Sequence, residues 1–136
     1  PTTPNTSSVT EDAAGTLRTY WLGPDEWQLV TNMERAKQLC LELTESLATM
    51  HAAVNDLSGG YVTMELRGEN AATTLAKGCT LDLDARVFGV GHCAQTTLGK
   101  SNVLIGVVDE PPVYELIVRR SFSDYVLAWL ETAAGP

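Results

Sequence analysis

The segment from residue 92 to residue 119 constrains the fold most, because it contains three apolar runs separated by two turn signals. Gly-Lys-Ser at 99–101 and Glu-Pro-Pro at 110–112 are residue types that favour chain reversals. Strands joined by such short connections pair antiparallel with their neighbours in the chain. The segment therefore predicts three strands of an antiparallel sheet, at about 92–98, 102–108 and 113–119.

The first half of the chain predicts two further pairs of strands. Residues 17–23 and 26–31 are short apolar and aromatic runs around a Gly-Pro-Asp turn. Residues 52–58 and 61–68 lie on either side of a Ser-Gly-Gly reversal, and the second run alternates apolar with polar positions. We expect the first pair to lie on either side of a tight turn, and the second pair to form a hairpin or a tight reversal.

Three helices are predicted between and after these strands. Thr31 and Glu34 have the spacing of a capping box for the first helix, a second occupies 69–78, and Ser121 caps the last, with Asp124 in its first turn. Apolar residues of the first helix recur at three- and four-residue spacing on one face that we expect to be buried: Met33, Ala36, Leu39, Cys40, Leu43, Leu47 and Met50. The order ββαββαβββα predicts an α+β fold with a mostly antiparallel sheet.

The start of the chain differs in composition from the rest. Residues 1–16 are rich in Pro, Ser, Thr and Asn and can bury little apolar surface, so we expect a flexible loop or tail. The 136 residues suffice for one ordinary core and are too few for two. Residues 17–136 are therefore predicted to form a single α+β domain.

Composition excludes several classes of protein. The formal net charge is −8, which argues against binding to nucleic acid or to an anionic membrane surface. No apolar run approaches the roughly 18 residues needed to span a bilayer. The three cysteines have no CxxC spacing and are expected to be free thiols in a reducing compartment, so we expect a cytoplasmic protein.

Several residues have the chemistry of a metal or nucleophile site. Cys79, His92 and Cys93, together with Asp82 or Asp84, are all potential ligands. His92 and Cys93 are adjacent, however, and adjacent side chains of a strand point to opposite faces. The two aspartates alternate with leucines, which is typical of a solvated face. We predict no catalytic, cofactor-binding or metal-binding residue on this chain.

Other polar groups leave alternatives open. His51 has no local orienting partner for catalysis. Arg119 and Arg120 have the chemistry to hold a carboxylate or phosphate, but they can equally pair with this chain's acidic groups or with a partner chain. We favour a surface or interface role for them. The glycines at 59–60 and 89–91 match no phosphate-binding motif.

Four long phrases of the sequence carry a family resemblance. They are YWLGPDEWQLV at 20–30, HAAVNDLSGGYVTMELRGENAATTLAKGCTLDLD at 51–84, GHCAQTTLGKSNVLI at 91–105 and YELIVRRSFSDYVLAWL at 114–130. Together they resemble the gamma subunit family of bacterial heterotetrameric sarcosine oxidases, from about Leu17 to Ala133. Family members usually carry another stretch before these phrases, so the chain is expected to be the C-terminal part of a longer gamma chain or a shortened whole one.

The resemblance implies a role within a complex of alpha, beta, gamma and delta chains. Such complexes oxidatively demethylate sarcosine to glycine with oxygen, producing hydrogen peroxide and, with tetrahydrofolate, 5,10-methylenetetrahydrofolate. The resemblance places FAD and FMN on the beta chain, NAD and the folate site on the alpha chain and zinc on the delta chain. It implies no cofactor on the gamma chain.

The gamma family is in turn similar to the folate-binding domain of the glycine-cleavage aminomethyltransferase. The catalytic aspartate of that enzyme precedes the strand that corresponds to 20–30, whereas this sequence has no carboxylate between Asp12 and Asp25. The enzyme also has a Gly-rich segment before the strand that corresponds to YELIV at 114–118. In this sequence the segment is replaced by VVDEPP at 107–112. Both departures favour a scaffold without folate chemistry.

The first hypothesis is therefore a non-catalytic structural subunit. Its expected partner anchors are the aromatic turn from Trp21 to Trp27 and the apolar Val87–Phe88 pair, while Tyr20 is a core or rim aromatic. The second hypothesis is a stand-alone folate-binding or aminomethyltransferase-like protein of the same fold. The third is an unrelated interaction module.

Overall fold

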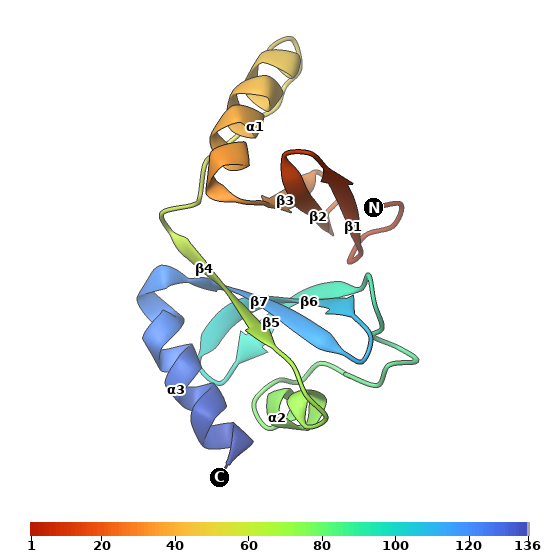
Figure 1. Cartoon of the computed structure of the whole chain (residues 1–136), viewed down its shortest axis with the longest axis vertical. Helices are drawn as coiled ribbons and strands as arrows, with labels where there is room; N and C mark the ends of the chain where they lie inside the picture. The colour runs from red at the N-terminus through yellow and green to blue at the C-terminus, as the bar shows by residue number, and fades with distance from the viewer. Residues whose placement is uncertain (136) are drawn as a thin grey trace.

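The computed structural model describes residues 1–135, which form two antiparallel sheets and three α-helices (Figure 1). The strands are β1 (Ser7–Asp12), β2 (Gly15–Gly23), β3 (Glu26–Val30), β4 (Tyr61–Leu66), β5 (Cys93–Leu98), β6 (Ser101–Asp109) and β7 (Val113–Arg119). The helices are α1 (Met33–Ser46), α2 (Ala71–Ala76) and α3 (Ser123–Ala134), with a 3-10 turn η1 (Arg120–Phe122) before α3. The predicted α+β class is confirmed.

The larger sheet has the strand order β4-β7-β6-β5 and is antiparallel throughout. Its last three strands agree with the prediction to within a residue or so at each end. The tight β5–β6 turn contains Gly99 at φ 58°, a conformation that favours glycine. Alternating residues of β6 and β7 point to opposite faces, and both faces are buried.

Helices α2 and α3 cover one face of the larger sheet and form the main core. Leu75 of α2 and Val126 of α3 are fully buried there beside Leu116 and Val118 of β7. The polar side of α3 faces solvent. This packing buries the helices' apolar sides against the sheet, which is the usual solution for an α+β fold.

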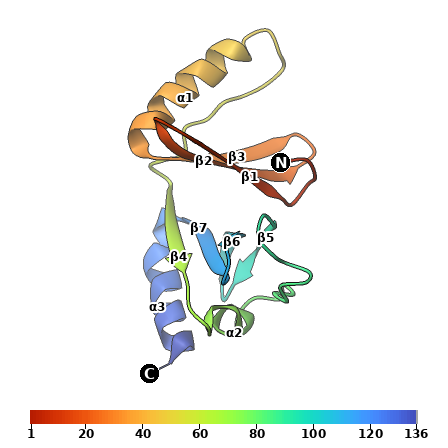
Figure 2. The same cartoon turned by 45° about the vertical axis from the view of Figure 1, so that its right-hand side comes forward.

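The smaller sheet, β1-β2-β3, covers the opposite face of the larger sheet (Figure 2). Tyr20 of β2 is fully buried at this contact, together with Cys93, Leu104 and Ile117 of the larger sheet. A Cβ added to Gly106 would lie 2.6 Å from Cε1 of Tyr20, so the glycine provides the space for the ring. The Tyr20 hydroxyl donates a 2.5 Å hydrogen bond to Glu115 Oε1.

The prediction that residues 1–16 are a loop or tail is wrong for its second half. Ser7–Asp12 forms β1, which pairs antiparallel with β2 from Ser7 opposite Tyr20 to Asp12 opposite Gly15. Most of β1 is exposed. An edge strand of this kind is held by backbone hydrogen bonds, which a composition-based estimate of apolar burial does not detect.

Helix α1 also differs from the prediction. Its N-cap is Asn32, whose Oδ1 accepts a 2.8 Å hydrogen bond from the Arg35 amide, while Thr31 donates its hydroxyl to the Thr16 carbonyl instead. The helix ends at Ser46, and none of its residues is buried. The apolar stripe is only partly covered within residues 1–135: Met33 and Met50 are exposed, and its other residues are half-buried.

Two further predictions of local structure are wrong. Residues 52–58 contain no strand, and β4 pairs with β7 at the edge of the larger sheet instead of with that segment. Ser121 does not cap α3, because the chain first makes the η1 turn and the α3 N-cap, Phe122, makes no side-chain cap. Within residues 1–135, no helix combines the length and apolar character needed to cross a bilayer.

Candidate interaction surface

The outer face of the smaller sheet carries exposed aromatic and apolar side chains. Because Tyr20 points toward the larger sheet, its neighbour Trp21 points away from it. Trp21 lies opposite Trp27 of β3, and their rings stack with centroids 6.0 Å apart and an interplanar angle of 24°. Trp27 is 49% exposed, and Leu29, two residues on, is 37% exposed. We call Trp21, Trp27 and Leu29 the tryptophan surface.

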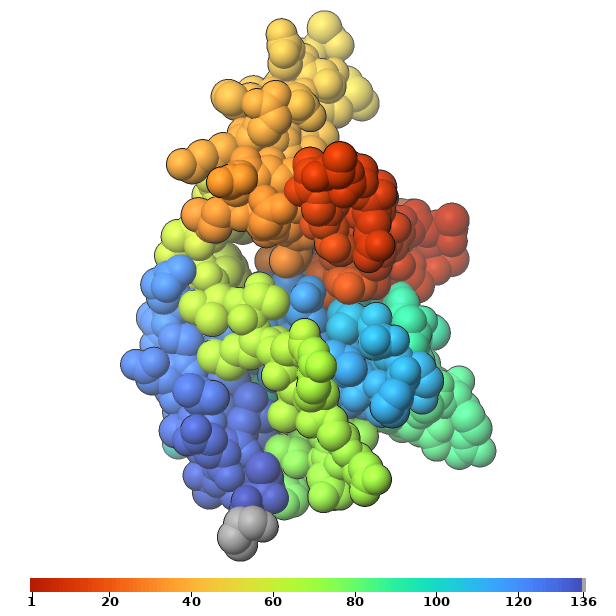
Figure 3. Space-filling view, in the orientation of Figure 1, coloured from red at the N-terminus to blue at the C-terminus, as the bar shows by residue number. Residues whose placement is uncertain are grey.

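Helix α1 stands on the same side of the smaller sheet, away from the larger one, and most of its length projects beyond the body of the molecule (Figure 3). Its first turn is fixed to the β1–β2 turn, because Arg35 contacts the Gly15 carbonyl and pairs with Asp12 at 2.7 Å. Met33 is 64% exposed and Leu41 68%. The tryptophan surface and α1 thus expose apolar area on one side of the chain.

The two residues of the predicted anchor at Val87–Phe88 differ in burial. Val87 is exposed, whereas Phe88 is buried against the main core, with its ring tilted against that of His92 at a centroid distance of 6.1 Å. The pair lies in the long connection between α2 and β5. Phe88 therefore fixes this connection to the core and is not available to a partner.

The structure separates the candidate metal and nucleophile residues. Cys79 and Cys93 belong to cores on opposite faces of the larger sheet, and Cys79 Sγ lies 3.6 Å from the Thr96 hydroxyl. His92 is exposed, with Nδ1 3.1 Å from the Gly89 carbonyl. Among residues 1–135, no group of three potential ligands is close enough to hold a metal ion.

The two aspartates and His51 occupy exposed positions of different kinds. Asp84 accepts hydrogen bonds from Arg86 Nε at 2.9 Å and Nη2 at 2.6 Å, and these hold the pKa of Asp84 below its usual value. Asp82 accepts from the Asp84 amide at 3.0 Å. Both carboxylates organise the connection before β5. His51 lies beyond the end of α1 and is exposed.

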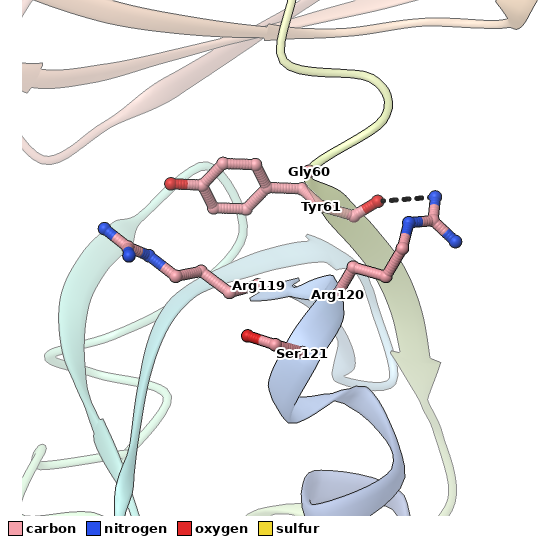
Figure 4. Close-up of a pocket in the computed structure, with 5 residues that line it drawn as sticks. All are labelled: Gly60, Tyr61, Arg119, Arg120 and Ser121. Carbon is pink, nitrogen blue, oxygen red and sulfur yellow. Dashed lines mark hydrogen bonds between the residues drawn. The ribbon is translucent and has the colours of Figure 1, made fainter.

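Arg119 and Arg120 lie together at the end of β7 and point in different directions (Figure 4). Arg120 Nε donates to the Gly59 carbonyl at 2.8 Å, so the Gly59-Gly60 segment is a backbone partner of this arginine. A shallow pocket of about 600 Å³ here is lined by Gly60, Tyr61, Arg119, Arg120 and Ser121.

Burial of two acidic groups between the sheets predicts loss of stability in alkali. Burial raises the pKa of the Cys93 thiol from 9.0 to about 11, and burial with the Glu115 hydrogen bond raises the pKa of Tyr20. The unfolded chain releases these protons first, so the folded chain binds more protons at alkaline pH. We expect Cys93 and Tyr20 to leave the free energy of unfolding unchanged below about pH 9 and to lower it toward pH 11, by at most about 1.4 kcal/mol per pH unit from Cys93.

Urea unfolding of the wild type and of Cys93→Ala at a series of pH values measures this effect. The variant has no thiol to titrate, so its decline should begin only near the ordinary tyrosine pKa of about 10. Equal slopes for the two proteins between about pH 9 and pH 10 would show that the Cys93 pKa is not raised.

The tryptophan surface is apolar and aromatic, which is typical of a protein that binds another protein chain. A family model described as sarcosine oxidase, gamma subunit family, matches residues 5–135. The chain belongs to this family. That membership excludes the hypothesis of an unrelated interaction module.

Curated relatives and a solved structure agree with this membership. The chain is 36% identical over 110 residues to sarcosine oxidase subunit gamma of Corynebacterium sp. (strain P-1), covering 81% of this chain and 53% of that protein. It is 34% identical over 122 residues to the same subunit of Corynebacterium sp. (strain U-96), covering 90% and 58%. The chain spans little more than half the length of these relatives.

The fold matches a chain in the structure of heterotetrameric sarcosine oxidase from Corynebacterium sp. U-96 in complex with pyrrole 2-carboxylate. The TM-score is 0.81 at 32% sequence identity, and the match covers 96% of this chain and 65% of that chain. The two-sheet arrangement described above is therefore shared with a chain of that complex.

Proposed function

We propose that this chain is a non-catalytic, structural subunit of a heterotetrameric sarcosine oxidase. The observation that carries the proposal is the tryptophan surface, on which the exposed Trp27 stacks against the half-buried Trp21, beside an α1 helix without a buried residue. Large aromatic side chains are the residues that contribute most to protein interfaces. A partner chain packed here would remove this apolar area from water.

The activity of the whole complex is part of the proposal. It is oxidative demethylation of sarcosine to glycine with oxygen, giving hydrogen peroxide and, with tetrahydrofolate, 5,10-methylenetetrahydrofolate. The partners are the alpha, beta and delta chains in the cytoplasm, and FAD, FMN, NAD, folate and zinc belong to them. On this chain Cys79, Cys93, Asp84 and Arg120 contribute to folding contacts, which supports a structural role.

The predicted single domain over residues 17–136 is also proposed, with β1 as an added edge strand. Limited proteolysis of the full-length protein tests it. One protected fragment that includes β1 is expected. Separate protected fragments for the smaller and the larger sheet would contradict it.

A tagged form of the protein, purified from its native cells, tests the function directly. We expect three further chains by mass spectrometry and a flavin absorption spectrum that sarcosine bleaches. A colourless protein that elutes alone would contradict the proposal. The remaining hypothesis, a stand-alone folate-binding protein, would then be tested by tetrahydrofolate titration.

Replacing Trp27 by alanine tests the surface. The dissociation constant of the partner chains is expected to rise roughly tenfold, about 1.4 kcal/mol, because an exposed indole is removed from the centre of the contact. The measurement is the fraction of partner chains that the tagged protein retains on dilution. Leu127→Ala is the matched control, since Leu127 is an exposed apolar residue on α3, remote from the smaller sheet. Equal losses from both variants would place the contact elsewhere.

A further inference from the structure

The pocket at the end of β7 gathers three polar groups that have no hydrogen-bond partner within residues 1–135. Tyr61 opens β4 directly opposite Arg119 in the strand register, so the two side chains lie on the same face of the sheet. Figure 4 shows both side chains pointing the same way, with Ser121 below them. Within residues 1–135, neither hydroxyl nor the Arg119 guanidinium makes a hydrogen bond to the protein.

Arg120, unlike Arg119, is bound to the backbone of this chain. The Arg120 amide donates to the Gly60 carbonyl at 2.9 Å, and its guanidinium donates to the Gly59 and Tyr61 carbonyls at 2.8 and 3.4 Å. These bonds fasten the start of β4 to the end of β7. Arg120 is therefore a positioning residue, and the rim of the pocket is held in place before any ligand arrives.

Arg119 is exceptional among the arginines of the described chain. Arg18, Arg35, Arg67 and Arg86 each lie within ion-pair distance of a carboxylate, and Arg120 is bound to carbonyl groups. Arg119 has neither kind of partner within residues 1–135. The chain carries 17 acidic and 9 basic residues, so an unpaired arginine here is not explained by a shortage of acidic groups.

The geometry points to a carboxylate-binding site in this pocket, filled by an acidic side chain or carboxyl terminus of a partner protein chain. The planar guanidinium of Arg119 matches a carboxylate in a two-point contact, and the Tyr61 and Ser121 hydroxyls add further hydrogen-bond donors to the lining of the pocket. The inference rests on the proposed function, because it requires a partner subunit.

Two observations favour a protein over a small molecule as the occupant. The pocket is shallow and open to solvent, so it can hold one anionic group but cannot bury most of the surface of a small molecule, as ligand pockets usually do. Leu57 and Phe122, close to the lining residues in the chain, are both exposed. Arginine and tyrosine with exposed apolar neighbours are typical of protein interfaces.

The first test measures partner retention by the tagged complex as the salt concentration is raised. Arg119→Gln is expected to raise the dissociation constant roughly tenfold and to weaken its dependence on salt. Arg67→Gln is the matched control, since Arg67 is an exposed arginine at the opposite end of β4 and its loss changes the net charge equally. Identical behaviour of the two variants would overturn the inference and leave the proposed function standing.

The second test identifies the occupant. In an Arg119→Lys complex, a carbodiimide reagent joins the new amine to a contacting carboxylate by an amide bond, and peptide mapping locates both ends. A cross-link from position 119 to a carboxylate of another chain is the expected result. A cross-link within this chain, or none in an intact complex, overturns it. If the wild-type chain retains no partners at all, the proposed function and the inference fail together.

Discussion

Replacing Tyr20 by alanine is expected to lower the free energy of unfolding by about 3–5 kcal/mol, the largest effect of any substitution considered. The ring is fully buried between the two sheets and packs against Gly106. Its removal leaves a cavity and takes from Glu115 the hydroxyl that donates to it. Urea unfolding followed by tryptophan fluorescence measures the loss, because two tryptophans lie in the smaller sheet.

Two companion variants separate the causes of this effect. Tyr20→Phe keeps the ring and removes the hydroxyl, and should cost about 1–2 kcal/mol since Arg18 remains 3.7 Å from Glu115. Gly106→Ala keeps Tyr20 but forces a methyl group against its ring, and should cost about 1–3 kcal/mol. A Tyr20→Ala protein as stable as the wild type would show that other contacts hold the sheets together.

Replacing Gly78 by alanine is expected to destabilise the chain by about 3 kcal/mol, the upper end of the range for overpacking. A Cβ at this position would overlap the indole of Trp129, which places α3 against the end of α2. The ring cannot move freely, because its other side borders Gly99. The helices would therefore have to separate, at the expense of the main core.

Gly23→Ala is the control for this substitution. An added Cβ at Gly23 meets no atom within 4 Å, so its effect should lie within about 0.5 kcal/mol. Both substitutions restrict the unfolded chain equally, so the difference between them isolates the contact with Trp129. Equal stabilities, measured by thermal or urea unfolding, would contradict the packing described for Trp129.

Local sequence patterns predicted most of the larger sheet, because its turns and the alternation of its strands are visible within a few neighbouring residues. Strands β5, β6 and β7 are bounded by turn residues, and Val103, Ile105 and Val107 alternate as one buried face. The helix end near Gly78 was also located correctly. The reason was not: Gly78 does not adopt a left-handed cap but makes room for an indole 51 residues later in the chain.

The missed features depend on contacts that a local pattern does not contain. The polar strand β1 exists because β2 offers it a backbone partner. Residues 52–58 form no strand, and β4 pairs instead with β7, which lies far along the chain. The apolar stripe of α1 was correctly found, but periodicity reports that a face is apolar and not whether this chain covers it.

In the candidate sites, too, the features set by local sequence were predicted and those set by long-range contacts were not. Strand alternation predicts that His92 and Cys93 point to opposite faces, and in the structure Cys93 is buried whereas His92 is exposed. It could not reveal that Arg120 would be bound to the backbone of residues 59–61 while Arg119 was left without a partner. That distinction requires the pairing of β4 with β7.

The contact of Tyr20 with Gly106 and Glu115 also has a mechanical consequence. The ring fits a gap in β6 and its hydroxyl is tied to β7, so the smaller sheet cannot slide along the larger one without breaking both contacts. Trp21 is the next residue of the same strand, so its backbone is held in place by the contacts of Tyr20 with the larger sheet. A surface held in this way loses little internal freedom when a partner covers it, so less of the binding free energy is spent on ordering it.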